Sequence, residues 1–153
     1  MPFKSKSKSM RPKLALTEDE LRQVLKEATF IKSYDFQLDS AAEGECTLFV
    51  PFQEAFVRPG DLVSGPVFMA AADVAMWLAI MTQLGRVDMA VTVEMKTSFL
   101  NAAKREDFWC TAKILKLGRR LIYGVAEGVN STGKLLTHHT LTYIRPVAEE
   151  PDT

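Results

Sequence analysis

A single carboxylate lies inside a long apolar stretch of this sequence. From Val67 to Met81 every residue is apolar except Asp73. Burying an ionised carboxylate without a partner is costly, so we expect Asp73 to be paired, protonated or functional. An apolar site should also raise the pKa of Asp73 and make it a better base than a solvated aspartate. We interpret Asp73 as a general base that activates water or as a nucleophile, and both roles stay open.

A second group that could act in the same reaction lies at the start of this stretch. The amide of Gly65 opens the predicted helix, where N–H groups lack partners and the helix dipole is positive. Such an amide can donate to the oxyanion that forms when water attacks an acyl carbonyl. Pro66 has no N–H, so Gly65 is expected to act alone or with the Ser64 hydroxyl. A base and an oxyanion donor are the two groups that thioester hydrolysis needs.

Other arrangements of reactive residues are weaker. Ser64 could pair with His138 or His139, but its neighbours lack the Gly-x-Ser-x-Gly pattern of a nucleophile elbow. A serine before a helix is most often a cap. The two histidines are adjacent on a predicted strand, so they point to opposite faces and cannot share a metal. No metal-ligand spacing occurs in the sequence, and we expect the histidines to be structural.

The stretch that carries these groups has the signals of a buried helix. The segment from Ser64 to Gly85 is apolar on all sides, which is typical of a core helix. The residues before Pro66 can cap its start, Pro66 suits the first turn, and Gly85 can end it. The apolar run is shorter than the roughly 18–20 residues that cross a bilayer, so no membrane segment is expected. Trp77, one turn after Asp73, belongs either to the core or to a substrate wall.

The other predicted elements are one short helix and several strands. A helix is predicted from a cap at Thr17, with Glu20 at its third position, to about Ala28. Closely spaced turn signals in the second half of the chain predict an antiparallel meander. The predicted strands are residues 31–38, 45–51, 91–99, 108–117, 121–130 and 135–144, with a turn at 39–44 and a loop at 56–61.

The strand at residues 91–99 alternates regularly. One face is predicted to carry Val91, Val93, Met95, Thr97 and Phe99, and the other Thr92, Glu94, Lys96 and Ser98. The alternation therefore places Thr92 on the face opposite Met95 and Thr97.

These elements predict an α+β architecture. A helix that is apolar all round must be covered on every side, and a curved antiparallel sheet of five or six strands can wrap around it. One sheet leaves part of the helix uncovered, so a second copy of the chain is expected there. The predicted domain spans residues 14–146, between a basic tail at 1–13, predicted to be disordered, and a polar tail at 147–153.

Composition excludes several classes of function. The formal net charge is zero, which does not favour binding to nucleic acid or to an anionic membrane. The two cysteines, Cys46 and Cys110, match no metal or redox motif and are expected to be free thiols in a reducing compartment. The basic start is not followed by an apolar run, so no signal peptide is predicted and a cytoplasmic location is expected.

Four segments together resemble the hot-dog fold, and in particular the acyl-CoA thioesterases of the phenylacetic-acid-degradation (PaaI-like) type. They are Ser64-Gly65-Pro66, Asp73, the run from Ala90 to Met95, and Leu117-Gly118-Arg119-Arg120. In that family a His-Gly-Gly opens the helix, and the catalytic carboxylate follows nine positions after the His. Here Ser64 stands at the His position, Pro66 replaces the second Gly, and Asp73 stands at the carboxylate position.

The resemblance implies an activity, a set of site residues and an assembly. It implies hydrolysis of a medium-chain or aromatic acyl-CoA, with coenzyme A as part of the substrate and no separate cofactor. Thr92 falls where the family places a Ser or Thr that orients the attacking water. Arg119 and Arg120 are candidates for the phosphates of coenzyme A, with Pro66 and Trp77 beside the acyl group. A homodimer, assembled further into a dimer of dimers, is the expected form.

Helix geometry independently favours a site shared between two chains. Gly65 and Asp73 are eight residues apart, which separates them by roughly 12 Å along one helix. A two-fold dimer can bring the Gly65 end of one helix to Asp73 of the other. Two rivals to the thioesterase remain, a hot-dog acyl-thioester hydratase or dehydratase and a non-catalytic acyl-CoA-binding module. The first generally uses an Asp–His pair, which the sequence lacks near Asp73.

Overall fold

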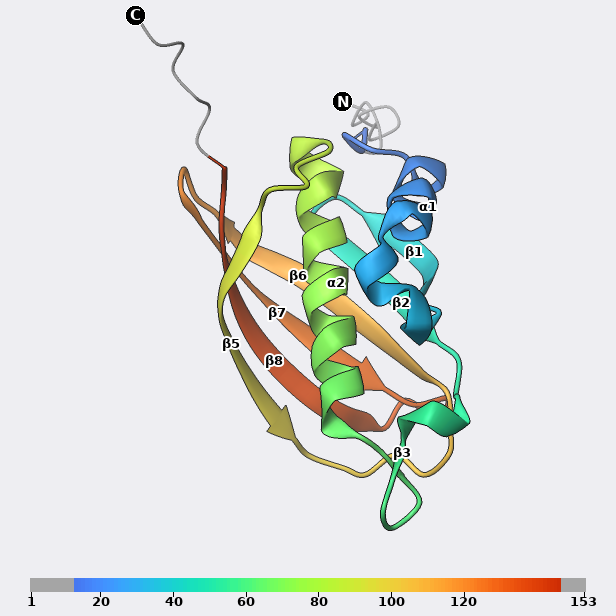
Figure 1. Cartoon of the computed structure of the whole chain (residues 1–153). Helices are drawn as coiled ribbons and strands as arrows, with labels where there is room; N and C mark the ends of the chain where they lie inside the picture. The colour runs from blue at the N-terminus through green and yellow to red at the C-terminus, as the bar shows by residue number, and fades with distance from the viewer. Residues whose placement is uncertain (1–12, 147–153) are drawn as a thin grey trace, which may run out of the picture.

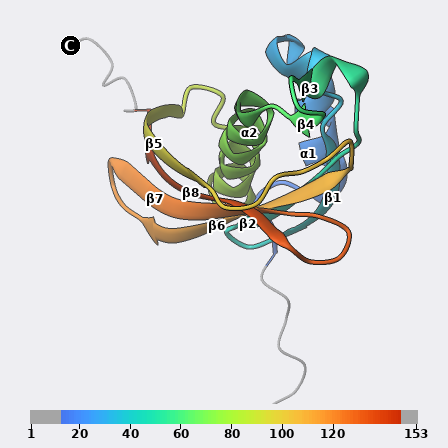
Figure 2. The same ribbon diagram turned by 90° about the horizontal axis from the view of Figure 1, so that it is seen from below.

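Six antiparallel strands form one curved sheet, and the long helix lies across its concave face. The computed structural model describes residues 13–146, so nearly all of the predicted tail at 1–13 and all of 147–153 lie outside the described residues. The strand order is β1-β2-β6-β7-β8-β5 (Figures 1 and 2). The strands are β1 (Gln37–Ala42), β2 (Glu45–Val50), β5 (Val91–Phe99), β6 (Phe108–Leu117), β7 (Leu121–Val129) and β8 (Leu135–Ile144). The predicted α+β hot-dog fold is confirmed.

The central helix α2 (Gly65–Leu84) begins and ends where the sequence predicts. Ser64 is its N-cap, a proline lies in its first turn, and Gly85 is its C-cap. The expected reason for excluding a membrane segment was wrong, because the whole helix is long and apolar enough to cross a bilayer. However, 67% of the most apolar 18-residue segment of this helix is buried inside the protein, which is typical of a core helix. The prediction of a core helix is therefore confirmed.

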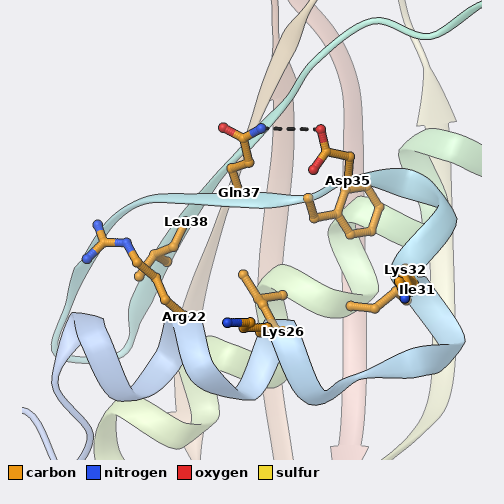
Figure 3. Close-up of a pocket in the computed structure, with 9 residues that line it drawn as sticks. Arg22, Lys26, Ile31, Lys32, Asp35, Gln37 and Leu38 are labelled. Carbon is orange, nitrogen blue, oxygen red and sulfur yellow. Dashed lines mark hydrogen bonds between the residues drawn. The ribbon is translucent and has the colours of Figure 1, made fainter.

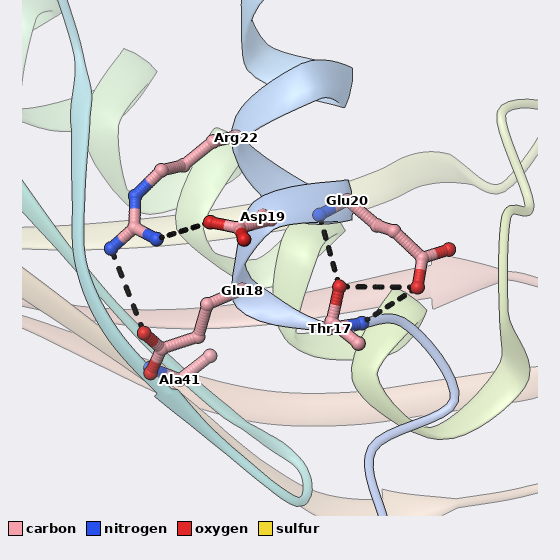
Figure 4. A network of polar contacts seen from close by, with 6 residues as sticks. All are labelled: Thr17, Glu18, Asp19, Glu20, Arg22 and Ala41. Atoms are coloured by element: carbon pink, nitrogen blue, oxygen red, sulfur yellow. Dashed lines mark hydrogen bonds and ion pairs between the residues drawn. The ribbon is translucent and has the colours of Figure 1, made fainter.

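The short helix α1 (Glu18–Glu27) also matches its prediction. Thr17 and Glu20 form a capping box, in which each side chain bonds the backbone amide of the other (Figure 4). Beside this box, the carboxylate of Glu18 accepts a hydrogen bond of 3.2 Å from the amide of Ala41 in β1. The helix is thereby fixed to the outer strand of the sheet.

The strand predicted at residues 31–38 is wrong over most of its length. Residues Thr29–Tyr34 form a 3-10 helix, η1, in which only Ile31 is buried. Asp35 then takes a left-handed backbone conformation, with φ of 54°, and the chain enters β1 at Gln37. Short apolar runs do not distinguish a strand from a helical turn, and this one is a turn. The turn predicted at 39–44 consists only of residues 43 and 44, because pairing with β2 extends β1 to Ala42.

The predicted loop at residues 56–61 contains a small hairpin. A 3-10 turn, η2 (Glu54–Phe56), leads into β3 (Val57–Arg58), which pairs with β4 (Leu62–Val63). The amide of Ser64 then donates to the carbonyl of Phe56 at 2.9 Å. This bond fixes the direction in which the chain enters α2.

A β-bulge in β5 changes the face on which Thr92 lies. Thr92 pairs with Tyr143 and Glu94 with Thr142, so Val93 is an extra residue in the ladder. Thr92 therefore shares the inner face of the sheet with Met95 and Thr97, whose β8 partners are Leu141 and His139. The regular alternation predicted for residues 91–99 is wrong at this point, because a bulge shifts the side-chain parity by one residue.

The helix packs tightly against β7 at Gly124. A Cβ atom at Gly124 would lie 2.4 Å from the Met76 methyl carbon and 2.5 Å from the carbonyl oxygen of Lys113. The methionine side chain could move away, but the carbonyl belongs to the backbone of β6. Only glycine fits this position without a shift of the sheet.

We expect Gly124→Ala to destabilise the protein by roughly 1–3 kcal/mol, because overpacking forces backbone shifts. Urea unfolding followed by circular dichroism measures the change. The control is Glu127→Ala on the same strand, where the side chain is about half exposed, and this variant should stay close to wild type. Equal stability of Gly124→Ala and wild type would contradict the close approach.

Candidate active site

Asp73 faces a cavity of about 270 Å³ between α2, β5 and η1. Two aromatic rings form one wall, with Phe30 of η1 edge-on to Trp77 of α2 at a centroid distance of 5.8 Å. Phe30 is 69% exposed, so this part of the wall also faces solvent. The lining residues are Phe30, Asp73, Val74, Trp77, Asp88, Ala90, Val91, Thr92 and Tyr143. The structure thus brings together three predicted site residues, Asp73, Thr92 and Trp77.

The Asp73 carboxylate is paired with two hydroxyl groups. Thr92 and Tyr143 both donate to its Oδ1 atom, each at 2.5 Å. The Tyr143 oxygen also lies 2.7 Å from the backbone carbonyl of Asp73. The side chain is half-buried rather than buried, since it opens onto the cavity. Of the three states expected from the sequence, the paired one is therefore present.

The sequence reasoning did not single out Tyr143 or Phe30. Tyr143 shares its parity in β8 with the buried residues His139 and Leu141, and that parity could have placed it inside. Burial and the nearby Asp73 charge raise the pKa of Tyr143 well above its usual value, so the hydroxyl stays protonated. Phe30 carried no such signal, because it lies between the predicted helix and the strand predicted at residues 31–38, and the 3-10 helix that presents it was not predicted.

The predicted oxyanion group lies at the other end of α2. Gly65 lines a separate cavity of about 420 Å³ beneath the start of the helix, together with Phe68, Phe99 and Leu100. Its amide has no hydrogen-bond partner within residues 13–146. Ser64 caps the helix without a side-chain hydrogen bond. Within one chain, Gly65 and Asp73 therefore open onto different cavities.

Pro66 and the two arginines also lie outside the Asp73 cavity. Pro66 is exposed in the first turn of α2. Arg119 and Arg120 form the exposed β6–β7 hairpin tip and line a cavity of about 520 Å³. In the register of the sheet, the end of this hairpin lies two strands from the start of β5. The arginines are thus at the same end of the sheet as Thr92 but do not touch Asp73.

A further cavity of about 480 Å³ lies between α1 and β1 (Figure 3). Three basic side chains, Arg22, Lys26 and Lys32, surround an apolar floor that includes Ile31 and Leu38. Arg22 is already engaged by two carboxylates of α1. None of the predicted site residues lines this cavity.

The two histidines face opposite sides of β8, as predicted. His139 is fully buried, and its ring nitrogens lie 2.8 Å from the hydroxyls of Thr97 and Thr137. Burial, with a smaller effect of His138, lowers the pKa of His139 to about 4. His138 is partly exposed and lies 3.9 Å from Glu127. Neither histidine contacts Asp73 or Ser64 among the described residues, so the structure shows no Ser–His pair in this part of the chain.

The buried His139 predicts a loss of stability in mild acid. Below about pH 6.5 the unfolded chain protonates this histidine, whereas the folded chain does so only near pH 4. The free energy of unfolding should therefore fall as the pH drops through this window and level off below it. Between pH 7 and 4.5, wild type should lose roughly 2–3 kcal/mol more than His139→Gln.

Urea unfolding at several pH values tests this prediction. The control is His138→Gln, which removes a partly exposed histidine and should keep the wild-type pH dependence. Parallel pH profiles for wild type and His139→Gln would contradict it.

Comparison with known proteins identifies relatives over the region that carries the site. Residues 60–137 match the family described as the thioesterase superfamily. The crystal structure of a protein from Silicibacter sp. TM1040, described as a "putative thioesterase", is 31% identical with a TM-score of 0.79. That similarity covers 90% of this chain and 97% of the other.

Two further relatives extend the comparison. A protein of Thermoplasma acidophilum named "Putative esterase Ta0293" is 25% identical over 125 residues, which is 82% of this chain and 94% of that protein. The PaaI protein of the phenylacetic acid degradation operon of Escherichia coli has a TM-score of 0.75 at 16% identity, covering 82% of this chain and 90% of its own. At that identity, the PaaI similarity concerns the fold alone.

Proposed function

This chain belongs to the thioesterase superfamily, and from that premise we propose that it hydrolyses the thioester bond of an acyl-CoA. The observation that carries the proposal is the Asp73 carboxylate, held by two hydroxyls at the mouth of a cavity with an aromatic wall. A carboxylate beside an apolar cavity can activate water next to a bound acyl group. We further propose a place among the enzymes of the PaaI-like type.

The proposed reaction adds water across the bond between the acyl carbon and sulfur. Asp73 removes a proton from water as the water oxygen attacks the carbonyl carbon. The resulting oxyanion accepts a hydrogen bond from the amide of Gly65. When the intermediate collapses, the carbon–sulfur bond breaks, and the proton returns from Asp73 to the departing thiolate. The products are a carboxylic acid and coenzyme A.

The alternative reaction uses Asp73 as the nucleophile. Its carboxylate attacks the carbonyl carbon, expels the thiolate and forms an anhydride, which water then hydrolyses. A single turnover in ¹⁸O-labelled water tests for the anhydride. Label in the Asp73 side chain establishes this route, because water has then attacked the aspartyl carbonyl. Label in the product acid alone fits both the general-base route and water attack on the acyl carbonyl of the anhydride, and trapping of the anhydride with hydroxylamine then separates the two.

We propose that the oxyanion donor comes from a second copy of the chain. Apart from Gly65, Gln83 and Leu84 at its two ends, the incompletely buried residues of α2 recur at helical spacing and form one stripe: Pro66, Met69, Ala70, Asp73 and Trp77. Beside this stripe, edge strand β5 exposes 54% of Val93 and 57% of Phe99. An isologous dimer that covers this apolar surface would place the Gly65 end of one α2 near Asp73 of the other. Two equivalent shared sites would result.

The remaining parts of the substrate are assigned by chemistry. The Phe30 and Trp77 rings suit an aromatic or medium-chain acyl group. Arg119 and Arg120 are our candidates for the phosphates of coenzyme A.

On the convex face of the sheet, exposed Leu115, Leu121 and Tyr123 form an apolar surface suited to a second dimer. The hydratase alternative is disfavoured because neither histidine lines the Asp73 cavity.

Replacing Asp73 with Asn should lower acyl-CoA hydrolysis roughly 100-fold or more, because the amide cannot take a proton from water. Thiol release from a panel of acyl-CoAs measures the effect, and hydration of an enoyl-CoA is followed in parallel. The fold should survive, since an amide can still accept hydrogen bonds from Thr92 and Tyr143. Wild-type turnover by the folded variant would exclude Asp73 as the base or nucleophile. Binding of acyl-CoA without turnover by wild type would favour the binding module instead.

Mixing two inactive variants tests the shared site. Gly65→Pro removes the donor amide and Asp73→Asn removes the base, so each variant should be inactive alone. After subunit exchange at equal concentrations, a mixed dimer holds one intact site, and up to roughly a quarter of full activity should return. Any residue larger than glycine crowds the Phe99 ring, so Gly65→Ala, which keeps the amide, is the control and should stay active. If mass spectrometry confirms the exchange but no activity returns, either the Gly65 amide and the Asp73 carboxylate act within one chain or one of them does not belong to the site.

A further inference from the structure

We propose that Tyr143 is a positioning residue for Asp73, and that Tyr143 and Thr92 together leave Oδ2 as the carboxylate oxygen that meets water. This inference rests on the proposed function of the same site. It adds a residue from β8 to the site and assigns the two carboxylate oxygens different tasks.

The hydrogen bonds at Asp73 are unequal between its two oxygens. Oδ1 lies 2.5 Å from the hydroxyl oxygens of both Thr92 and Tyr143. Within residues 13–146, no donor contacts Oδ2. An oxygen that already accepts two hydrogen bonds is a poorer proton acceptor than one that accepts none. Oδ2 is therefore the oxygen that receives the proton of the attacking water.

Tyr143 is rigidly placed for this task. Its side chain is only 3% exposed, and its strand is paired on both sides, with β5 and with β7. Its hydroxyl oxygen lies within reach of both the Oδ1 atom and the backbone carbonyl of Asp73, at 2.5 and 2.7 Å. The single hydroxyl proton can serve either acceptor, and both belong to the same residue. Tyr143 thus ties the side chain and the backbone of Asp73 to the sheet.

The register of the sheet brings Thr92 and Tyr143 together. The two residues are direct partners across the β5–β8 pair, and the bulge at Val93 gives Thr92 its inward orientation. Thr92 on β5 and Tyr143 on β8 then both donate to the same atom, Oδ1 of Asp73 in α2. Since the Tyr143 hydroxyl remains protonated, it acts as a permanent donor and does not itself take part in proton transfer.

The Tyr143→Phe variant keeps the ring and removes only the hydroxyl. We expect kcat to fall about tenfold or more with little change in KM, because the carboxylate loses an orienting bond made before and during the reaction. The acid limb of the kcat–pH profile should move to higher pH, because a donor that stabilises the carboxylate form has been removed. Tyr34→Phe is the matched control, since Tyr34 is a partly buried tyrosine of η1 that does not line the Asp73 cavity, and its profile should match wild type.

A purely structural role predicts a different outcome. It would lower the melting temperature and the active fraction but leave the pH profile of kcat unchanged, and this result would overturn the proposal. Thr92→Val should shift the acid limb in the same direction, and Thr92→Ser, which keeps the donor, should restore the wild-type profile. A Thr92→Val profile identical to wild type would overturn the assignment of Oδ1 to the two donors.

A spectroscopic test needs neither turnover nor a stable Tyr143 variant. In the wild-type chain labelled with [¹³Cζ]tyrosine, the Tyr143 resonance should follow the titration of Asp73, and Asp73→Asn should abolish that response. A Tyr143 resonance insensitive to pH in the acid range would overturn the contact. The outcomes separate the two proposals. Full activity of Asp73→Asn would contradict the proposed function, whereas a Tyr143 resonance that does not respond to pH would contradict only the positioning role.

Discussion

The structure depends on the burial of a helix that has almost no polar face. Residues such as Leu78, Ile80 and Met81 are completely buried in α2. Each such side chain contributes on the order of 1.5–3 kcal/mol when it leaves water. The sheet curves around the helix and supplies most of this cover, and Gly124 leaves room for the Met76 side chain of α2. The stripe that remains uncovered is the one that carries Asp73 and Trp77.

The reactive group is therefore placed by the same packing that stabilises the fold. Three elements meet at Asp73, because the helix carries the carboxylate while β5 and β8 supply the hydroxyls. The bulge in β5 turns the Thr92 hydroxyl toward the carboxylate, and the register of the sheet pairs Thr92 with Tyr143. A carboxylate at this depth is tolerated because its hydrogen bonds replace those it made with water.

Strong periodic signals allowed much of this arrangement to be predicted from the sequence. The apolar run fixed α2 and Asp73, and regular turns fixed the strands β6 to β8. The bulge at Val93 could not be predicted, because it depends on the pairing of β5 with β8 and leaves the local alternation intact. The same is true of Tyr143, whose contact with Asp73 joins residues 70 positions apart. The 3-10 helix that presents Phe30 was missed because a short apolar run fits either a strand or a turn.

The two edges of the sheet differ in how they can be extended. At the β1 edge, helix α1 covers the strand, and the Glu18 carboxylate accepts a hydrogen bond from the Ala41 amide (Figure 4). At the β5 edge, the backbone groups beyond the bulge are open, while Glu94 and Lys96 place charges along the strand. Bulges and charged residues are devices against strand-by-strand polymerisation. With one edge blocked, antiparallel pairing of β5 with a copy of itself would use up the open edge in both chains, so growth of the sheet would end at two chains and would not continue into a fibre.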